Sequence, residues 1–416
     1  MNLLEDLEFR GLLYQITDQE NLAQRLQSGP LALYNGFDPT ADSLHVGSLL
    51  PILLLRRFQQ AGHTPIALVG GGTGLIGDPG GKAEERSLNP LETVEEWSEK
   101  IKGQLEPFLD FTAAGNPARM VNNYDWLGDI KAIDLLRDIG KHFPVPYMLA
   151  KDSVASRLES GISYTEFSYM ILQAYDFMKL YQTHHCELQT GGSDQWGNIT
   201  AGADLVRRTL GQKVYGLTCP LVTKADGTKF GKTESGTVWL DPQRTTPYQF
   251  YQFWINADDD SVVQYLKYFT FLSRDEILQL EAATREHPEK RAAQKQLAEE
   301  LTTLVHGGEA TRKAEKISRA LFYGELLELE EDEIEQGFND VPSHSMAEPE
   351  LGLIDLLVQA GISSSKRQAR EDIKNGAVYI NGERCTQLDR RLRKEEGLHR
   401  KYIIIRRGKN KYFLIR

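Results

Sequence analysis

The chain has 416 residues, 40% of them hydrophobic, and a formal net charge of −11 at pH 7. At about 150 residues per domain, this length allows two or three domains with sizeable cores. No apolar run approaches the ~20 residues of a bilayer span, and the acidic N-terminal segment lacks a signal-peptide pattern, so we expect a cytoplasmic protein without membrane association. The three cysteines, Cys186, Cys219 and Cys385, lie far apart outside any Cys-x-x-Cys or Cys/His cluster, which argues against a structural zinc site or a disulfide framework.

The first part of the chain, up to about residue 230, alternates short apolar strands with amphipathic helices. This order predicts an α/β fold with a doubly wound, Rossmann-like parallel sheet. The expected strands are 31–37, 65–69, 120–122, 186–189 and 217–222, and the expected helices are 49–61, 91–108, 164–180 and 198–209. From Pro247 the pattern is helical, with helices expected at 248–255, 262–269, 275–285, 290–305 and 309–321.

The first predicted strand runs into a Gly/Asp/Pro turn, and a helix is predicted to begin at His45-Val46-Gly47-Ser48. A strand that turns into a helix N-terminus gathers backbone N–H donors at a point that favours phosphate. Gly47 would let a flat base or a backbone approach closely, and His45 could donate to a phosphate oxygen. An ordinary βα unit with a surface histidine would fit this segment equally well.

Residues 72–77 match the G-x-G-x-x-G pattern of dinucleotide-binding proteins, but their context does not. That pattern needs a helix that opens inside the glycines, and Asp78-Pro79-Gly80-Gly81 would break one. The acid that should end a second strand about 20 residues later is replaced by a predicted helix. We therefore expect a wide loop that aims Asp78 into a site, and a dehydrogenase is disfavoured.

Tyr169, Gln173 and Asp176 share one face of the helix predicted at 164–180. This stripe is too polar for an ordinary core, and the apolar residues around it leave little room for solvent, so a ligand-lining face is indicated. Gly192, Asp194 and Gln195 follow a predicted strand end, where open parallel sheets bind ligands. Asp194 and Gln195 could bond ribose hydroxyls or an amino-acid head.

A basic loop follows at residues 224–233 and ends Lys229-Phe230-Gly231-Lys232-Thr233. Its end resembles that of a phosphate-binding P-loop, but Asp226 stands where that loop needs its first glycine. A P-loop kinase or GTPase is therefore disfavoured. A solvated basic hairpin is the simpler alternative to a functional loop.

The last part of the chain is compositionally distinct. An acidic run and a Pro/Ser/His-rich stretch at 325–350 predict a linker. Residues 351–416 then hold 16 Lys and Arg against 7 Asp and Glu, whereas the rest of the chain has a balance of −20. This asymmetry predicts a basic appendage for a polyanion. Lys366, Arg367, Arg370 and Lys374 have helical spacing and could meet phosphates.

Taken together, the two phosphate-binding segments resemble the signatures of class I aminoacyl-tRNA synthetases. His45–Ser48 resembles the His-Ile-Gly-His signature, and residues 229–233 resemble Lys-Met-Ser-Lys-Ser in the variant typical of bacterial tyrosyl enzymes. The resemblance to bacterial tyrosyl-tRNA synthetases extends over nearly the whole chain, and residues 351–416 resemble the RNA-binding module named after ribosomal protein S-four. We therefore expect domains at 1–246 (catalytic), 247–324 (helical) and 351–416 (RNA-binding), with 325–350 between the last two.

The resemblance implies roles for individual residues. Tyr34 and Asp176 would bond the phenolic hydroxyl of substrate tyrosine, and Asp78, Tyr169 and Gln173 would hold its α-ammonium. Residues along the adenylate would be Gly36, Asp38, Gly47, Ser48, Gly192, Asp194 and Gln195, with Gln195 also at the tyrosine. Residues at the triphosphate would be Thr40, His45, Lys82, Arg86, Lys229, Lys232 and Thr233. Ser48 stands where the family usually has a second histidine, so its role is open, and no protein ligands for a metal are expected.

The implied activity is tyrosine–tRNA ligation: L-tyrosine and ATP form tyrosyl-adenylate, and tRNA(Tyr) accepts the tyrosine. A carboxylate nucleophile is already ionised, so positioning and charge stabilisation replace a general base. Mg²⁺ would arrive with ATP. The resemblance also implies a homodimer joined through the catalytic domains, and we expect the apolar stretch 143–149 at the contact. The alternatives are a tryptophanyl-tRNA synthetase and a non-catalytic RNA-binding protein on the same fold.

Overall fold

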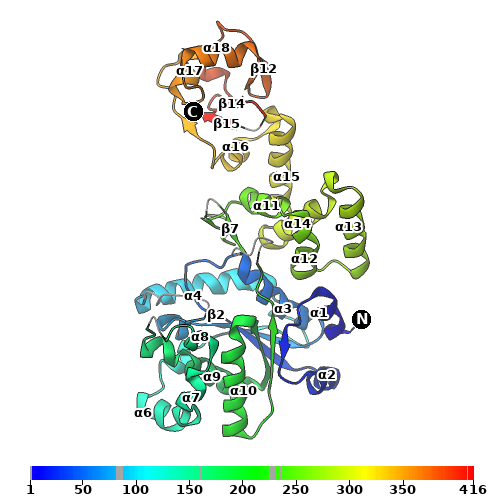
Figure 1. The fold of residues 1–416 in the computed structure, drawn as a ribbon, viewed down its shortest axis with the longest axis vertical. Coiled ribbons are helices and arrows are strands. Elements are labelled where there is room, and N and C mark those ends of the chain that lie inside the picture. The colour runs from blue at the N-terminus through cyan, green and yellow to red at the C-terminus, as the bar shows by residue number, and fades with distance from the viewer. Residues whose placement is uncertain (1, 81–87, 159–160, 224–229, 234–235, 410) are drawn as a thin grey trace. The chain divides into compact units, whose positions relative to one another are not determined.

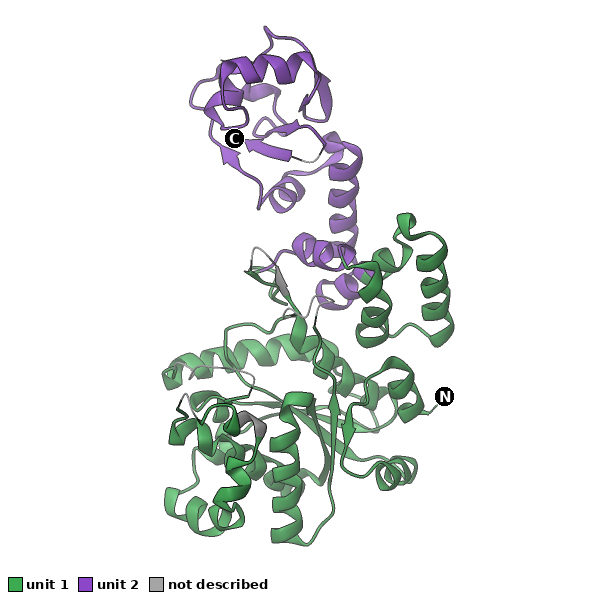
Figure 2. Cartoon of the chain, viewed as in Figure 1, with its two compact units in different colours: residues 1–244, 257–297 green, residues 245–256, 298–416 purple. Residues whose placement is uncertain are grey.

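The structure is a computed structural model that describes residues 2–80, 88–158, 161–223, 230–233, 236–409 and 411–416. It divides the chain into two compact units (Figure 2), residues 1–244 with 257–297 and residues 245–256 with 298–416. Each unit is described by itself below. The helices between 247 and 324 are shared between the units, because α12 (Asp259–Phe269) packs against α3 (Leu49–Gln60) and α11 (Pro247–Ile255) packs against α15 (Gly308–Tyr323).

The first unit contains a six-stranded sheet of order β1-β6-β5-β2-β3-β4. Figure 1 labels its strand β2. The strands are β1 (Gln15–Ile16), β2 (Ala32–Phe37), β3 (Thr64–Val69), β4 (Arg119–Asn122), β5 (Cys186–Gly192) and β6 (Tyr215–Cys219). The pairs from β6 to β4 are parallel, which confirms the predicted doubly wound sheet. β1 adds an antiparallel edge that the strand pattern did not predict, since only two of its residues pair.

The expected helices are present in this unit as α3, α4 (Leu91–Leu105), α9 (Tyr164–His184) and α10 (Trp196–Leu210). α9 and α10 pack on each other and on β5 and β6. Their core includes Tyr34, Phe177 and Leu205, all less than 2% exposed. Elements that the sequence analysis did not predict are α1 (Leu3–Arg10), α2 (Gln19–Gln27), α5 (Tyr124–Leu127), α6 (Ala132–Asp134), α7 (Val145–Leu149) and α8 (Asp152–Ala155).

The remaining helices follow the helical pattern after Pro247. They are α11, α12, α13 (Arg274–Glu286), α14 (Ala292–His306) and α15. α13 begins with a capping box in which the Ser273 and Glu276 side chains each accept from the other's backbone N–H, which satisfies two donors that the first turn leaves free. Such local signals explain why these boundaries agree closely with those expected.

The predicted linker at 325–350 is wrong, because the stretch folds into the second unit. α16 (Glu331–Gly337) and the turn before it bury Leu326, Ile334 and Phe338, each at most 1% exposed, against Tyr402 and Leu414. β9 (Ser343–His344) pairs in parallel with β15 (Lys411–Ile415). A few apolar residues set among acids and prolines therefore pack on the sheet, although the overall composition is that of a linker.

The C-terminal part combines a helix pair with a five-stranded sheet of order β12-β11-β14-β15-β9. The helices are α17 (Leu353–Gln359) and α18 (Lys366–Lys374), and the further strands of this sheet are β11 (Val378–Ile380), β12 (Glu383–Cys385) and β14 (Ile403–Arg407). β10 (Glu350–Gly352) and β13 (Arg391–Arg393) pair with each other in a separate two-stranded sheet. Apolar residues of both helices and of the sheet share one core, with Leu353, Ile373 and Ile405 fully buried. Residues 351–416 thus have a core of their own.

Candidate active site

The candidate site lies where the strand order of the first unit reverses. β2 and β5 are parallel neighbours, and the chain proceeds from β2 to β3 but returns to place β5 on the other side. Ligands of open α/β sheets bind at the carboxyl ends of strands at such a point. Asp38 follows β2 and Asp194 follows β5, so the structure brings these two predicted residues to the expected edge.

His45 caps the short 3-10 helix Val46–Ser48 that leads into α3. The Gly47 N–H donates to His45 Nδ1 at 3.0 Å, so a neutral ring carries its proton on Nε2 and can donate outward. The side chain is exposed, yet nearby protein atoms lower the pKa of His45 below its ordinary value by partial desolvation. A Cβ at residue 47 would lie 2.7 Å from His45 Cε1, so glycine is needed for the imidazole to fold back on its own helix turn.

The two signature segments meet through their backbones, although about 180 residues separate them along the chain. The Val46 N–H donates to Val238 O at 3.0 Å, and the Val238 N–H donates to Gly231 O at 2.9 Å. Leu240 N–H donates to Leu44 O at 2.9 Å, which extends the pairing. Lys232 and Thr233 form β7 and pair with β8 (Gly236–Thr237). Lys82, Arg86 and Lys229 lie outside the described residues.

Gly231 is expected to tolerate no side chain. Its φ is +80°, and a Cβ would lie 2.7 Å from Val46 Cγ2. Gly231→Ala should therefore shift residues 230–233, the described end of the basic loop 224–233 (called the lysine loop below). It should lower the rate of tyrosine-dependent ATP–pyrophosphate exchange by roughly tenfold or more, with the KM for tyrosine unchanged. Gly211→Ala is the matched control, because Gly211 has a φ of +66° with nothing within 4 Å. Equal activities for the two variants would contradict this expectation.

The polar stripe of α9 faces the ends of β2 and β3. The Tyr169 hydroxyl donates to Asp38 Oδ2 at 2.7 Å, and the Thr73 hydroxyl donates to Asp38 Oδ1 at 2.7 Å. Burial and the nearby carboxylates Asp38 and Asp78 raise the pKa of Tyr169 well above its ordinary value, so Tyr169 remains a donor. A Cβ at Gly70 would lie 1.9 Å from Asp38 Oδ1, which leaves room only for glycine beside this carboxylate.

Asp176 is 2% exposed and accepts two hydrogen bonds from residues that the sequence analysis missed. Asn123 Nδ2 donates to Asp176 Oδ2 at 2.9 Å, and Trp126 Nε1 donates to Oδ1 at 2.7 Å. Asn123 also bonds Thr73 and the Gly72 N–H, so one amide links the glycine loop to the stripe. The position of Asn123 at the carboxyl end of β4 was the available signal, since polar residues at such ends often face the site.

Three polar atoms on β2, α9 and β5 are buried without a hydrogen-bond partner among the described residues. They are Tyr34 Oη, Gln173 Oε1 and Gln189 Oε1. Burial, together with the negative charge of Asp176, raises the pKa of Tyr34 well above its ordinary value, so its hydroxyl keeps its proton. Buried polar atoms without partners are costly, and a site that must bond a polar ligand is one reason for a protein to retain them.

The surroundings of Asp176 also predict a pH-dependent stability. Burial raises the pKa of Asp176 to about 7, against the opposing effect of Asn123 and Trp126. Between pH 4 and 7 the folded state then holds a proton that the unfolded chain has lost, so stability falls as pH rises through this window, by up to about 4 kcal/mol. In the substrate-free protein, the free energy of unfolding of Asp176→Asn should rise relative to that of wild type between pH 4 and 7. Above pH 7 the difference between the two proteins should be constant. A difference between the two proteins that is constant with pH would contradict the assignment.

The glycine loop ends at Asp78 beside the turn that follows β5. Gln195 Nε2 donates to Asp78 Oδ2 at 2.6 Å, and the Gly80 N–H donates to Oδ1 at 2.9 Å. Asp78 is 8% exposed, and Gly77 before it has a φ of +87°. The predicted wide loop that aims Asp78 at the strand ends is therefore present, and the structure brings Asp78, Asp194 and Gln195 together.

The other predicted residues of this part have simpler surroundings. Gly36 is exposed, and a Cβ there would meet only Leu68 at 3.8 Å, so the glycine leaves open surface at the end of β2. Thr40 is exposed, and its N–H donates to Asp38 O at 2.9 Å. The Ser48 side chain makes no cap hydrogen bond to α3. Gly192 ends β5, and a Cβ there would lie 2.6 Å from Asp194 Oδ1.

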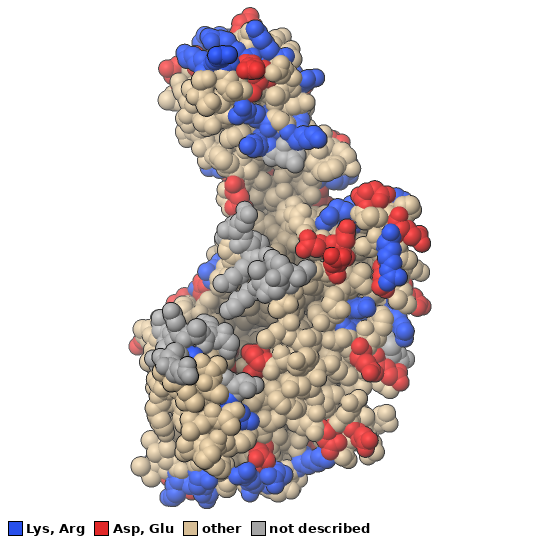
Figure 3. Space-filling view, viewed as in Figure 1, with Lys and Arg blue, Asp and Glu red and all other residues tan. Residues whose placement is uncertain are grey.

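The basic residues predicted for RNA lie on the exposed face of α18. Lys366, Arg367, Arg370 and Lys374 are all exposed, whereas Ala369, Asp372 and Ile373 of the same helix are buried. Lys366 also pairs with Asp355 at 2.6 Å. Figure 3 shows Lys and Arg gathered over this part of the C-terminal unit. The described part of the chain contains no helix that is both long and apolar enough to cross a bilayer. It also contains no cluster of three or more His, Cys, Asp or Glu suited to a metal ion.

The chain matches known proteins over its full length. The family model "tRNA synthetases class I (W and Y)" matches residues 26–323, and "Tyrosine--tRNA ligase SYY-like C-terminal domain" matches residues 333–415. The tyrosine–tRNA ligase 1 of Bacillus cereus is 64% identical and that of Geobacillus stearothermophilus 63%, each over 100% of both chains. A C-terminally truncated mitochondrial tyrosyl-tRNA synthetase of Aspergillus nidulans has a TM-score of 0.69 and 30% identity, covering 77% of this chain and 94% of that one.

The chain therefore belongs to the class I aminoacyl-tRNA synthetases, whose family model covers residues 26–323 and whose fold it shares. Within the class it falls among the bacterial tyrosyl-tRNA synthetases. It is an enzyme that ligates tyrosine to tRNA with ATP as a substrate. The tryptophanyl and non-catalytic alternatives are not favoured, because relatives at 63–64% identity over the whole length are named tyrosine–tRNA ligases.

Proposed function

We propose that the site at the ends of β2 and β5 forms tyrosyl-adenylate with the residue roles given below. The observation that carries the proposal is the buried Tyr34 hydroxyl, which has no partner among the described residues and lies close enough to Asp176 for its pKa to respond to that carboxylate. The phenol of tyrosine would donate to Asp176 and accept from Tyr34, so both buried groups would be satisfied. Phenylalanine would leave them unpaired.

The acceptors at the other end of the site suit the α-ammonium of tyrosine. Asp78, Tyr169 and Gln173 would hold this group: Gln173 Oε1 is buried without a partner among the described residues, and the Tyr169 hydroxyl is held by its hydrogen bond to Asp38. The adenylate would lie along Gly36, Asp38, Gly47, Ser48, Gly192, Asp194 and Gln195, where the glycines leave room for it. Gln195, held by Asp78, lies between the two groups of residues.

The first chemical step needs no general base. A carboxylate oxygen of tyrosine attacks the α-phosphorus of ATP, an O–P bond forms, and the bond to the bridging oxygen of pyrophosphate breaks. His45 would donate to the phosphates from Nε2, together with Thr40, Lys82, Arg86, Lys229, Lys232 and Thr233. In the second step, a hydroxyl of the terminal tRNA ribose forms an ester bond to the acyl carbon, the bond from that carbon to the phosphate oxygen breaks, AMP leaves, and the hydroxyl proton is released.

We further propose that Mg²⁺ arrives with ATP, because the described residues offer no cluster that would hold it alone. No step is assigned to the ion. ATP–pyrophosphate exchange tests the site, with tyrosine, tryptophan and phenylalanine each offered to the full-length enzyme. The assignment is supported if wild type catalyses exchange with tyrosine but not with tryptophan or phenylalanine. It also requires that variants of Tyr34 or Asp176 lose exchange with tyrosine. Tyrosine affinity that survives both substitutions would refute it.

We propose that tRNA(Tyr) is bound in part by the exposed basic face of α18. Replacing Lys366, Arg367, Arg370 and Lys374 together by alanine should raise the KM for tRNA and flatten its dependence on salt, because up to four phosphate contacts are lost. Pyrophosphate exchange with tyrosine serves as the internal control, since it involves no RNA, and should not change. An unaltered KM for tRNA would exclude this face from the interface.

We also propose a cytoplasmic homodimer. Exposed apolar side chains gather in the segment 133–164, with Ile133 70%, Val145 58% and Tyr164 69% exposed. Of the stretch predicted for the interface, Val145 and Leu149 are exposed, whereas Phe143 and Met148 are buried. A covered apolar surface would suit these residues. Sedimentation at twice the mass of one chain supports the dimer, and a monomer at micromolar concentration would refute it.

A further inference from the structure

The lysine loop has one described aromatic anchor, and it rests on α12. The Phe230 ring stacks on Phe269, with centroids 5.5 Å apart and an interplanar angle of 11°, and it also meets Tyr265 at 5.3 Å. Phe230 is 9% exposed, so this contact is a packed one. Phe230 lies next to Lys229 in sequence and two residues from Lys232. The position of α12 therefore sets the position of the loop's base.

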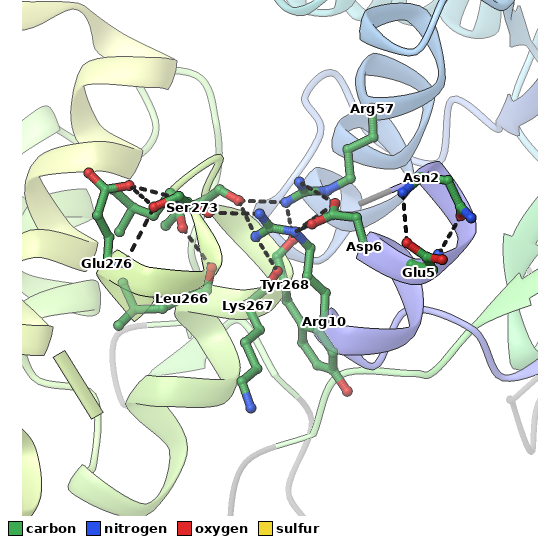
Figure 4. Close-up of polar contacts among 12 residues, drawn as sticks. Asn2, Glu5, Asp6, Arg10, Arg57, Leu266, Lys267, Tyr268, Ser273 and Glu276 are labelled. Atoms are coloured by element: carbon green, nitrogen blue, oxygen red, sulfur yellow. Dashed lines mark hydrogen bonds and ion pairs between the residues drawn. The ribbon is translucent and has the colours of Figure 1, made fainter. Parts of the chain in front are cut away.

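The carboxyl end of α12 is held by two buried arginines from elsewhere in the unit (Figure 4). Arg10 of α1 donates to Thr270 O at 3.0 Å and to Leu272 O at 2.7 Å. Arg57 of α3 also donates to Thr270 O. Asp6 lies 2.9 Å from Arg10 Nε and 3.8 Å from Arg57 Nη1. We call Asp6, Arg10 and Arg57 the arginine clamp.

The arginine clamp fixes a helix end at a large cost in desolvation free energy. Both arginines are 4% exposed, and one carboxylate balances two guanidinium groups. Burial, with the positive charge of Arg10, lowers the pKa of Arg57 to about 9. The free carbonyls at a helix C-terminus carry partial negative charge and compensate in part. Well-packed apolar residues at such a position are often at least as stabilising as buried charges. Stability therefore does not account for the arginine clamp, whereas the fixed geometry that it gives to the end of α12 does.

We propose that the arginine clamp positions residues 230–233, the described end of the lysine loop, for adenylate formation by fixing the end of α12, on which Phe230 is seated. Asp6, Arg10 and Arg57 are thus positioning residues that do not touch substrate. The inference rests on the proposed role of the loop lysines at the triphosphate. It extends the machinery of the first step to α1 and to the carboxyl end of α3, neither of which belongs to the signature segments.

The test compares full-length variants by pyrophosphate exchange. Arg57→Met should lower kcat by about 10- to 100-fold, because a shift of about 1 Å in a positioned group costs up to that much. The KM for tyrosine should stay within twofold, since the residues proposed to bind the substrate phenol, Tyr34 and Asp176, lie on β2 and α9 and not on α12. Arg25→Met is the matched control: Arg25 also pairs with a carboxylate, Glu187 at 2.6 Å, and donates to backbone carbonyls, but away from α12. The kcat of Arg25→Met and its KM for tyrosine should both stay within twofold of wild type.

A double-mutant cycle separates positioning from general destabilisation. Phe230→Leu should also lower kcat, and the Phe230→Leu/Arg57→Met double variant should lose little more than either single variant, because both act through one contact. Losses that multiply, or a KM for tyrosine that rises together with the fall in kcat, would overturn the proposal. Arg57→Lys keeps the buried charge and replaces Arg57→Met if that variant fails to fold. Arg57→Lys should lower kcat by a smaller factor, and an unchanged kcat would contradict the proposal.

Lys232→Ala distinguishes failure of this inference from failure of the proposed function. If Lys232→Ala impairs exchange but the variants of Arg57 and Phe230 do not, the loop acts on ATP and the arginine clamp has no part in it. If Lys232→Ala leaves exchange unchanged, the proposed role of the loop itself is refuted. Impairment by all three supports both.

Discussion

Replacing Asp176 by alanine is expected to lower kcat/KM for tyrosine by at least about 100-fold while leaving the KM for ATP within about twofold. The substitution removes the acceptor for the substrate phenol and leaves Asn123 Nδ2 and Trp126 Nε1 without their bonds of 2.9 and 2.7 Å. A hydrogen bond to a charged group contributes about 1.5–3 kcal/mol, and buried groups left unpaired add to the loss. Each 1.36 kcal/mol is a factor of ten in rate.

Steady-state pyrophosphate exchange and direct tyrosine binding check this expectation together. Asp204→Ala is the control, because Asp204 lies on α10 and pairs with Arg207 and Arg208 at the surface. Its constants should equal those of wild type. If the Asp176 variant bound tyrosine as tightly as wild type, the phenol would have to be recognised elsewhere, and the role of Tyr34 would fall with that of Asp176.

Replacing His45 by alanine should lower kcat for adenylate formation by about 100- to 1,000-fold, with the KM for tyrosine unchanged. That range is typical for the loss of one preorganised donor to developing charge. The Gly47 N–H occupies Nδ1, so only Nε2–H faces outward. His45→Gln keeps an N–H donor and should recover part of the rate. His287→Ala is the control, since that ring is 54% exposed and lies beside Glu289.

The lowered pKa of His45 adds a test by pH. The folded pKa lies below 6.5, so the ring is neutral at pH 7 and its Nε2–H donor persists as pH rises further. At saturating tyrosine, kcat should therefore not fall between pH 7 and 8.5 on account of this group. A steep fall through that range, absent from the His45→Gln variant, would mean that the charged imidazolium is required.

The parts of the site that were predictable are those that reside in one segment. The spacing of Tyr169, Gln173 and Asp176 predicts a shared face, and the Gly/Asp turn after β2 predicts a strand end. Asn123, Trp126 and Thr73 were missed because their roles depend on where the loops after β3 and β4 return, which periodicity does not encode. The same holds for Phe230, whose partners on α12 lie over 30 residues further along the chain.

At residues 325–350 the sequence predicted a linker, and the structure shows a folded segment. Its acids, prolines and serines suggest a solvated connection, yet Leu326, Ile334, Phe338 and Met346 are each no more than 2% exposed. Average composition conceals a few apolar residues, and their burial is decided by the sheet that they meet. In the C-terminal part of the chain, charge predicted exposure better than average composition predicted folding, since the basic residues expected at the surface of α18 are exposed.

The last strand, β15, lies between β14 and β9 within its sheet, although it is made after both of them. During synthesis, each of those neighbours keeps an open edge until residues 411–415 leave the ribosome, and open edges invite wrong pairing. A chain interrupted just before this point would already contain the whole first unit. We expect such a product to activate tyrosine but to be an early substrate for proteases at the open edges of β14 and β9, which only residues 411–415 cover.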